Sequence, residues 1–101
     1  MDDEQYLIDR EIGKATLESL DPSWDDAELI VDLSLGKVGL LLRRLSSGEI
    51  AVPSDQLQLA VGHLAQHHAD TASGLQRIRY VFRRKPDGKW KFEADFVYPE
   101  D

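Results

Sequence analysis

The feature that most constrains the fold is a pair of alternating segments near the end of the chain, separated by a tight turn. Every second residue of both segments is apolar: Ile78, Tyr80 and Phe82, then Trp90, Phe92, Ala94, Phe96 and Tyr98. A period of two places side chains alternately on the two faces of a strand. The turn is residues 85–88, where Pro presets φ, Asp bonds the local backbone and Gly accepts a positive φ. The sequence therefore predicts a β-hairpin over residues 77–98, with an aromatic face that other elements must cover.

The second face of this hairpin is charged. Arg77, Arg79 and Arg83 alternate with the apolar residues of the first strand, and Glu93 and Asp95 do so in the second. Opposite charges on neighbouring strands contribute roughly 0.2–1 kcal/mol per pair. We therefore expect the arginines to lie beside the two acids and to neutralise them.

Upstream, the patterns alternate between helix and strand. A helix is expected from Asp2 or Asp3 to about residue 20, with Ile8, Ile12 and Ala15 on its buried face. Strands are expected over residues 28–35 and 38–45, joined by a turn at residues 36–37, with a short third strand over 50–52 after a turn at 46–48. A second helix, capped by Ser54 or Asp55, should run to about residue 71. Leu57, Val61, Leu64 and His68 follow a helical spacing, and the three histidines (His63, His67, His68) are expected on the polar or boundary face of this helix.

The order of these elements predicts an α+β fold in one domain spanning residues 1–101. We expect an antiparallel sheet of four to five strands with two helices on one face, because the short turns leave no room for parallel crossovers. The absence of cysteine excludes disulfide scaffolds, thiolate metal sites and thiol catalysis. Neither a secretory signal nor an apolar run of spanning length is present, so a cytoplasmic location and no membrane partner are expected.

Few residues suggest chemistry. His63 and His67 are four apart on the second predicted helix, a spacing that can bind one metal ion, so a metal-dependent enzyme stays open as an alternative. The acids at positions 25, 26, 28 and 32 are expected to form a solvated edge. No nucleophile elbow or phosphate-binding loop is present. The sequence predicts no catalytic residue, no metal and no cofactor.

Charge is unevenly distributed along the chain, whose net charge is −7. Residues 1–35 contain 11 acids and 2 bases, residues 36–92 contain 4 acids and 10 bases, and residues 93–101 contain 4 acids and no base. An acidic protein is repelled by nucleic acid and attracted to basic proteins. We therefore expect no direct nucleic-acid binding.

The C-terminal third resembles the end of the YezG-like immunity family, small antitoxins of bacterial polymorphic toxin and contact-dependent inhibition systems. The resemblance lies in residues 74–82, GLQRIRYVF, and 86–98, PDGKWKFEADFVY. The family ends in an alternating strand, a turn with Asp-Gly-Lys, and an aromatic and acidic strand. The upstream order of elements is also similar, so the resemblance in order covers nearly the whole chain.

This resemblance implies a cytoplasmic immunity protein that binds the C-terminal domain of a cognate toxin, often a basic nuclease, and blocks its active site or substrate groove. We expect acidic residues around the first strand and at the C-terminus to bind the toxin, with a tryptophan as apolar anchor. The expected partner-binding residues are Trp24, Asp25, Asp26, Glu28, Asp32, Glu93, Asp95, Glu100 and Asp101. The alternative is a non-enzymatic adaptor or secretion-chaperone subunit that recognises a peptide, with strand 50–52 as the pairing edge. The sequence leaves the oligomeric state open.

Overall fold

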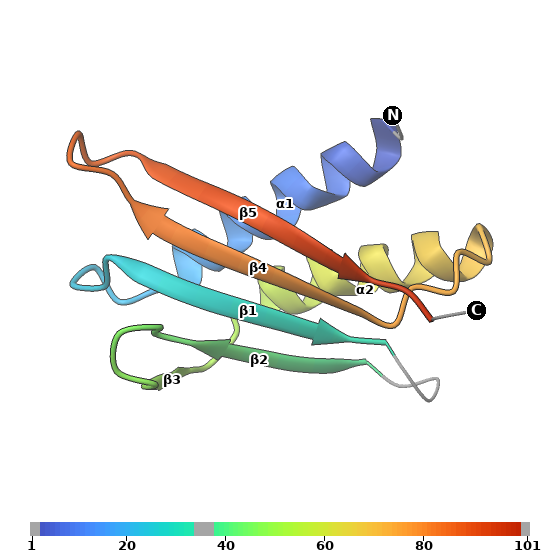
Figure 1. Ribbon diagram of the computed structural model, residues 1–101, viewed down its shortest axis with the longest axis horizontal. Coiled ribbons are helices and arrows are strands. Elements are labelled where there is room, and N and C mark those ends of the chain that lie inside the picture. Colours follow the sequence, from blue (N-terminus) through green and yellow to red (C-terminus); the bar gives the residue numbers. More distant parts are fainter. Residues whose placement is uncertain (1–2, 34–37, 100–101) are drawn as a thin grey trace.

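The protein is a five-stranded antiparallel sheet with two helices on one face, as seen in the computed structural model, which describes residues 3–33 and 38–99 (Figure 1). The elements in chain order are α1 (Asp3–Ser19), β1 (Asp26–Asp32), β2 (Gly39–Arg43), β3 (Ile50–Ala51), α2 (Asp55–Asp70), β4 (Arg77–Arg84) and β5 (Trp90–Val97). The predicted α+β class and the predicted order of elements are confirmed.

The strand order is β3-β2-β1-β4-β5, which places β1 at the centre of the sheet. β1 pairs antiparallel with β2 on one side and with β4 on the other. The chain reaches β4 only after passing through α2, so β1 and β4 are far apart in sequence but adjacent in space. Because β1 lies between β2 and β4, its charged side chains contact those of both strands.

The core lies between the sheet and the two helices. The strands contribute Leu29, Val31, Leu42, Ile78, Tyr80 and Phe82, all nearly inaccessible to solvent. The helices contribute Ile8, Ile12 and Ala15 from α1 and Leu57, Ala60, Val61 and Leu64 from α2. The predicted apolar stripes are confirmed. His63 is exposed and His68 is half-buried, as expected, but His67 is buried, because the buried stripe of α2 runs through Ala60 and His67.

Helix α2 begins as the sequence predicts. The Ser54 hydroxyl accepts a hydrogen bond from the Leu57 N–H at 3.1 Å, and the helix ends at Asp70 with Thr71 as its C-cap. A side-chain acceptor at the N-cap satisfies one of the amide groups that have no partner inside the helix. The preceding β3 is shorter than predicted, at two residues.

The hairpin between β4 and β5 is confirmed. Gly88 has φ of 86°, its N–H donates to the Lys85 carbonyl at 2.9 Å, and the Asp87 carboxylate accepts from the Lys89 N–H at 2.9 Å. The aromatic face of β5 is covered less than expected, since Phe92 is 40% exposed and Tyr98 is 46% exposed. The reason is that β5 is an edge strand, so α1 reaches only part of it; Gly13 of α1 lies against the Phe92 ring.

Two other turn predictions have different outcomes. The turn at residues 46–48 is confirmed, because Gly48 adopts φ of 75° and its N–H donates to the Arg44 carbonyl at 2.8 Å. The turn predicted at residues 36–37 lies outside the described residues.

One polar link crosses the core. The buried Tyr80 hydroxyl of β4 donates to the Asp9 carboxylate of α1 at 2.8 Å. Burial raises the pKa of Tyr80, and the negative charge and hydrogen bond of Asp9 raise it further. Tyr80 therefore stays protonated and fixes α1 against the centre of the sheet.

Candidate functional site

Glu28 is the central residue of the sheet face that the helices do not cover. Its side chain is 2% exposed, although no described element packs over that face. The Arg43 Nε of β2 donates to one carboxylate oxygen at 2.6 Å, and the Arg79 Nε of β4 donates to the other. Burial raises the pKa of Glu28, but the hydrogen bonds and positive charges of Arg79 and Arg43 outweigh it, so the pKa lies below its usual range. The Glu28 carboxylate therefore links β1 to both of its neighbours, β2 and β4.

The other acids around β1 also face basic or donor groups. Asp32 lies 3.5 Å from Arg77, and Asp25 lies 3.8 Å from Arg84. Asp26 accepts a hydrogen bond from the Ser46 N–H at 3.2 Å. The expected solvated acidic edge is therefore wrong for Glu28, which is buried between arginines of β2 and β4, whereas Asp25 is 73% exposed and Asp26 and Asp32 are partly exposed.

Glu93 and Asp95 lie on the same uncovered face as the arginines, as predicted, and are well exposed. Asp95 is opposite Arg79 in the register, but their closest charged atoms are 4.0 Å apart, because Arg79 is already bound to Glu28. Glu93 is opposite Val81, and its ion pair is with Lys91 at 3.4 Å. The expected pairing with an arginine is therefore confirmed for Asp95, as a long contact to Arg79, and is wrong for Glu93, which pairs with a lysine.

Trp24 does not lie where a partner could reach it. It precedes β1, is 3% exposed and belongs to the hydrophobic core. The expectation of an apolar anchor at Trp24 is therefore wrong: the hydrophobic side chain completes the core beside the start of the central strand. The two other predicted residues, Glu100 and Asp101, lie outside the described residues.

Within residues 3–33 and 38–99, the acidic excess lies in the two helices. The uncovered sheet face is balanced, with five acids (Asp26, Glu28, Asp32, Glu93, Asp95) and five bases (Arg43, Arg77, Arg79, Arg83, Lys91). The two helices together contain seven carboxylates and only two basic side chains, with histidines counted as neutral. Among the described residues, net negative charge is therefore concentrated in the helical layer.

A shallow interhelical groove of about 330 Å³ runs between α1 and α2. Its lining residues are Glu4, Leu7, Ile8, Glu11, His63, Gln66, His67 and Asp70. The two helices meet there through Glu11 and His63, 3.0 Å apart, and through Glu4 and His67, 3.5 Å apart. Sequence reasoning missed this groove, because its residues come from two helices whose packing no local pattern specifies.

The histidines of α2 contact different groups. His63 lies against Glu11 and His67 against Glu4, whereas the ring nitrogens of His68 lie 2.6 Å from Ser73 Oγ and 2.6 Å from Gln5 Oε1. Over residues 3–33 and 38–99, no group of three or more histidine or carboxylate side chains is arranged to hold a metal ion.

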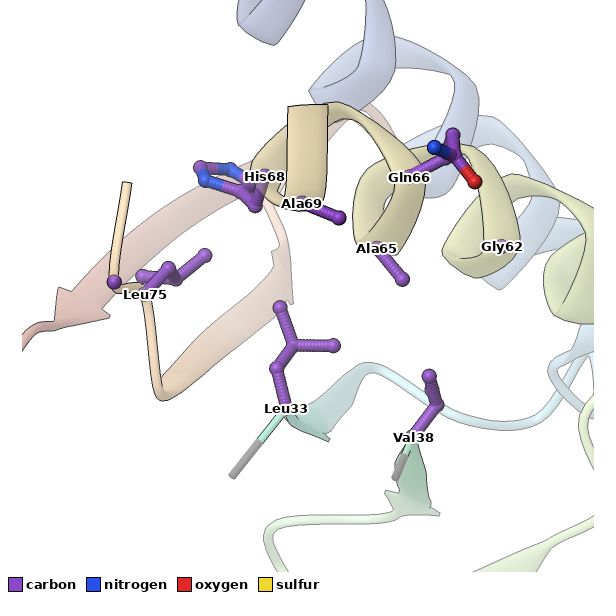
Figure 2. A pocket seen from close by; sticks show the side chains of 9 residues that line it. Leu33, Val38, Gly62, Ala65, Gln66, His68, Ala69 and Leu75 are labelled. Atoms are coloured by element: carbon purple, nitrogen blue, oxygen red, sulfur yellow. The ribbon is translucent and has the colours of Figure 1, made fainter. Parts of the chain in front are cut away.

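A second hollow, of about 440 Å³, lies between α2 and the ends of β1 and β2 (Figure 2). Figure 2 shows Leu33 and Val38 projecting toward Ala65 and Ala69 of α2. The lining is mainly apolar, and His68 at one end is the ionisable side chain among the described lining residues. These residues do not supply the paired acid, base or nucleophile that catalysis needs.

Comparison of the sequence with protein-family models and with curated proteins gives no match. Neither helix of the described chain combines the length and apolar character that crossing a membrane requires.

Proposed function

We propose that this protein is a cytoplasmic immunity protein that binds a cognate bacterial toxin domain, a basic nuclease, and neutralises it without catalysis. The observation that carries the proposal is the charge of the helical layer, in which seven carboxylates stand against two basic side chains. Nucleases carry basic surfaces that bind phosphates, and carboxylates presented on a rigid layer can occupy those positions. The resemblance of residues 74–98 to the YezG-like immunity family supports the same role.

In this proposal the interhelical groove is the centre of the toxin-binding surface. The carboxylates of Glu4, Glu11 and Asp70 border the groove, and Leu7 and Ile8 form its apolar part. Guanidinium and ammonium groups of the toxin would meet the carboxylates while their alkyl stems cover the apolar part. Long-range attraction to the layer would also raise the association rate.

Exposed apolar residues of the helices supply the anchors that Trp24 does not. Tyr6, Leu7 and Leu59 are 54%, 61% and 55% exposed, which leaves much of each side chain available for contact. Aromatic and aliphatic anchors usually carry much of the affinity of an interface. Asp25, Glu93 and Asp95 are exposed outside the helices and would contribute only to long-range attraction.

Co-expression tests the proposed function. The C-terminal 150 or so residues of the protein encoded directly upstream, about one domain in length, would be expressed with and without this chain. A fragment that arrests growth alone should be harmless when this chain is present, and the two proteins should co-purify. Growth arrest that persists despite soluble immunity protein would contradict the proposal, and an empty vector and an unrelated acidic domain serve as controls.

A further inference from the structure

The outer edge of β5 is unpaired in the described structure, since β5 is the last strand of the order β3-β2-β1-β4-β5. The Lys85 N–H donates to the Lys89 carbonyl at 2.7 Å, which fixes the phase of the hydrogen bonds between β4 and β5. Because bonded and non-bonded positions alternate along an antiparallel pair, Lys91, Glu93 and Asp95 direct their backbone groups toward β4. The N–H and C=O groups of Phe92 and Ala94 and their even-numbered neighbours therefore point out of the sheet.

The two edges of the sheet differ in how they resist pairing. Strand β3 offers two residues and is followed by Pro53, both of which are common protections of an edge. Strand β5 is eight residues long, contains no proline and has no residue with positive φ. Its charges lie on the uncovered face, above the plane of the edge. The β5 edge is therefore accessible to another strand, whereas β3 offers only two residues for pairing.

The charge pattern of β5 is complementary to that of a second, antiparallel copy of the same strand. Lys89 and Lys91 stand at its start and Glu93 and Asp95 toward its end. When two copies of such a strand run antiparallel about Phe92, Lys91 of each copy lies opposite Glu93 of the other, and Lys89 is near Asp95. If the two-fold axis passes through Glu93 instead of Phe92, the two copies of Glu93 lie opposite each other. If it passes through Ala94, Glu93 of each copy lies opposite Asp95 of the other. Like charges directly opposite are destabilising, so charge selects the first register.

We propose that two copies of this chain form a dimer through antiparallel pairing of their β5 edges about Phe92, which joins the two sheets into one of ten strands. On the helical side, Phe92 is 40% exposed and its ring stacks on Phe82 with centroids 5.6 Å apart. Pairing about Phe92 brings the exposed parts of the two Phe92 rings together. The dimer does not depend on the toxin-binding role, and either proposal can fail without the other.

Sedimentation equilibrium from about 1 μM to about 1 mM tests this pairing, because a small edge interface gives a concentration-dependent dimer. Two-fold symmetry doubles each charge change, so Lys91→Glu and Glu93→Lys should each raise the dissociation constant by about tenfold or more. The double variant restores opposite charges at both positions and should return the constant to within about threefold of the original. In the register with the axis through Glu93, the double variant instead brings two lysines together at position 93, and in the register with the axis through Ala94, Glu93→Lys alone would strengthen pairing by facing Asp95.

Two further variants separate edge pairing from other effects. Ala94→Pro removes an N–H that points out of the sheet, so it should leave a monomer with an unchanged circular dichroism spectrum. Glu49→Lys makes the same charge change as Glu93→Lys but lies beside β3 at the opposite edge, and it should leave the dimer unchanged. A monomer at every concentration, or a double variant that does not restore pairing, overturns the proposal.

Discussion

Replacing Trp24 with alanine is expected to lower the free energy of unfolding by about 3–5 kcal/mol, the range for removing a large buried aromatic side chain. Trp24 is 3% exposed and lies in the core just before the central strand. Small domains are stable by only about 5–15 kcal/mol, so this change removes a large share of the total. Urea denaturation followed by circular dichroism measures it.

Trp90 is the matched control, because it is the second tryptophan and is only partly buried. Its ring lies under the Arg84 guanidinium, 5.0 Å from centre to centre, near the hairpin turn. Trp90→Ala should cost about 1–2 kcal/mol, since less apolar area and one cation–π contact are lost. Trp24→Phe keeps most of the buried volume and allows binding to be measured on a folded protein. Equal losses for Trp24→Ala and Trp90→Ala would contradict the core position of Trp24.

The Glu28→Gln variant is expected to lose about 2–3 kcal/mol of stability at neutral pH, because the amide keeps one acceptor oxygen for one arginine and turns an NH2 donor toward the other at a buried site. Both guanidinium groups keep about two-fifths of their side-chain surface exposed, at 42% for Arg43 and 41% for Arg79. Solvent therefore compensates part of the loss, and we place the effect below that of a fully buried ion pair. Asp95→Asn removes an exposed charge 4.0 Å from Arg79 and should change stability by less than about 0.5 kcal/mol.

The same substitution should change the dependence of stability on pH. The pKa of Glu28 is lower in the folded protein than in the unfolded chain, where a glutamate has a pKa of about 4.3. Its contribution is therefore fully present above the unfolded pKa and is lost as pH falls through the folded pKa. Denaturation midpoints of wild type and Glu28→Gln should differ most above about pH 5 and converge in stronger acid. A constant difference at every pH would contradict the ionised state of Glu28.

The elements of the fold were predictable from the sequence because each depends on local patterns. The hairpin over β4 and β5 follows from a period of two and from Asp87-Gly88, whose conformational needs are local. Strand order was not predictable, because the sequence does not show that β1 lies between β2 and β4. Pairing between strands distant in sequence depends on the packing of the whole domain.

The error in the candidate site follows from that missing order. The sequence predicts a free acidic edge at Asp26, Glu28 and Asp32, but in the central strand each lies opposite an arginine of one neighbouring strand: Arg83 of β4, Arg43 of β2 and Arg77 of β4, respectively. The sequence suggests an interface anchor at Trp24, but tryptophan is common both in interfaces and in cores. The local sequence does not distinguish between these two positions. The groove of Glu4, Glu11 and Asp70 depends on how two helices pack, which no local pattern specifies.

The most direct measurement is the affinity of the toxin fragment for two charge-matched variants. One removes three charges from the groove (Glu4→Gln, Glu11→Gln, Asp70→Asn), and the other removes three exposed charges beyond the helices (Asp25→Asn, Glu93→Gln, Asp95→Asn). By titration calorimetry at several salt concentrations, the groove variant should bind about 10–100-fold more weakly and with less salt dependence, and the other should stay within about threefold of wild type. Full affinity in the groove variant, with loss in the other, would contradict binding through the helical layer.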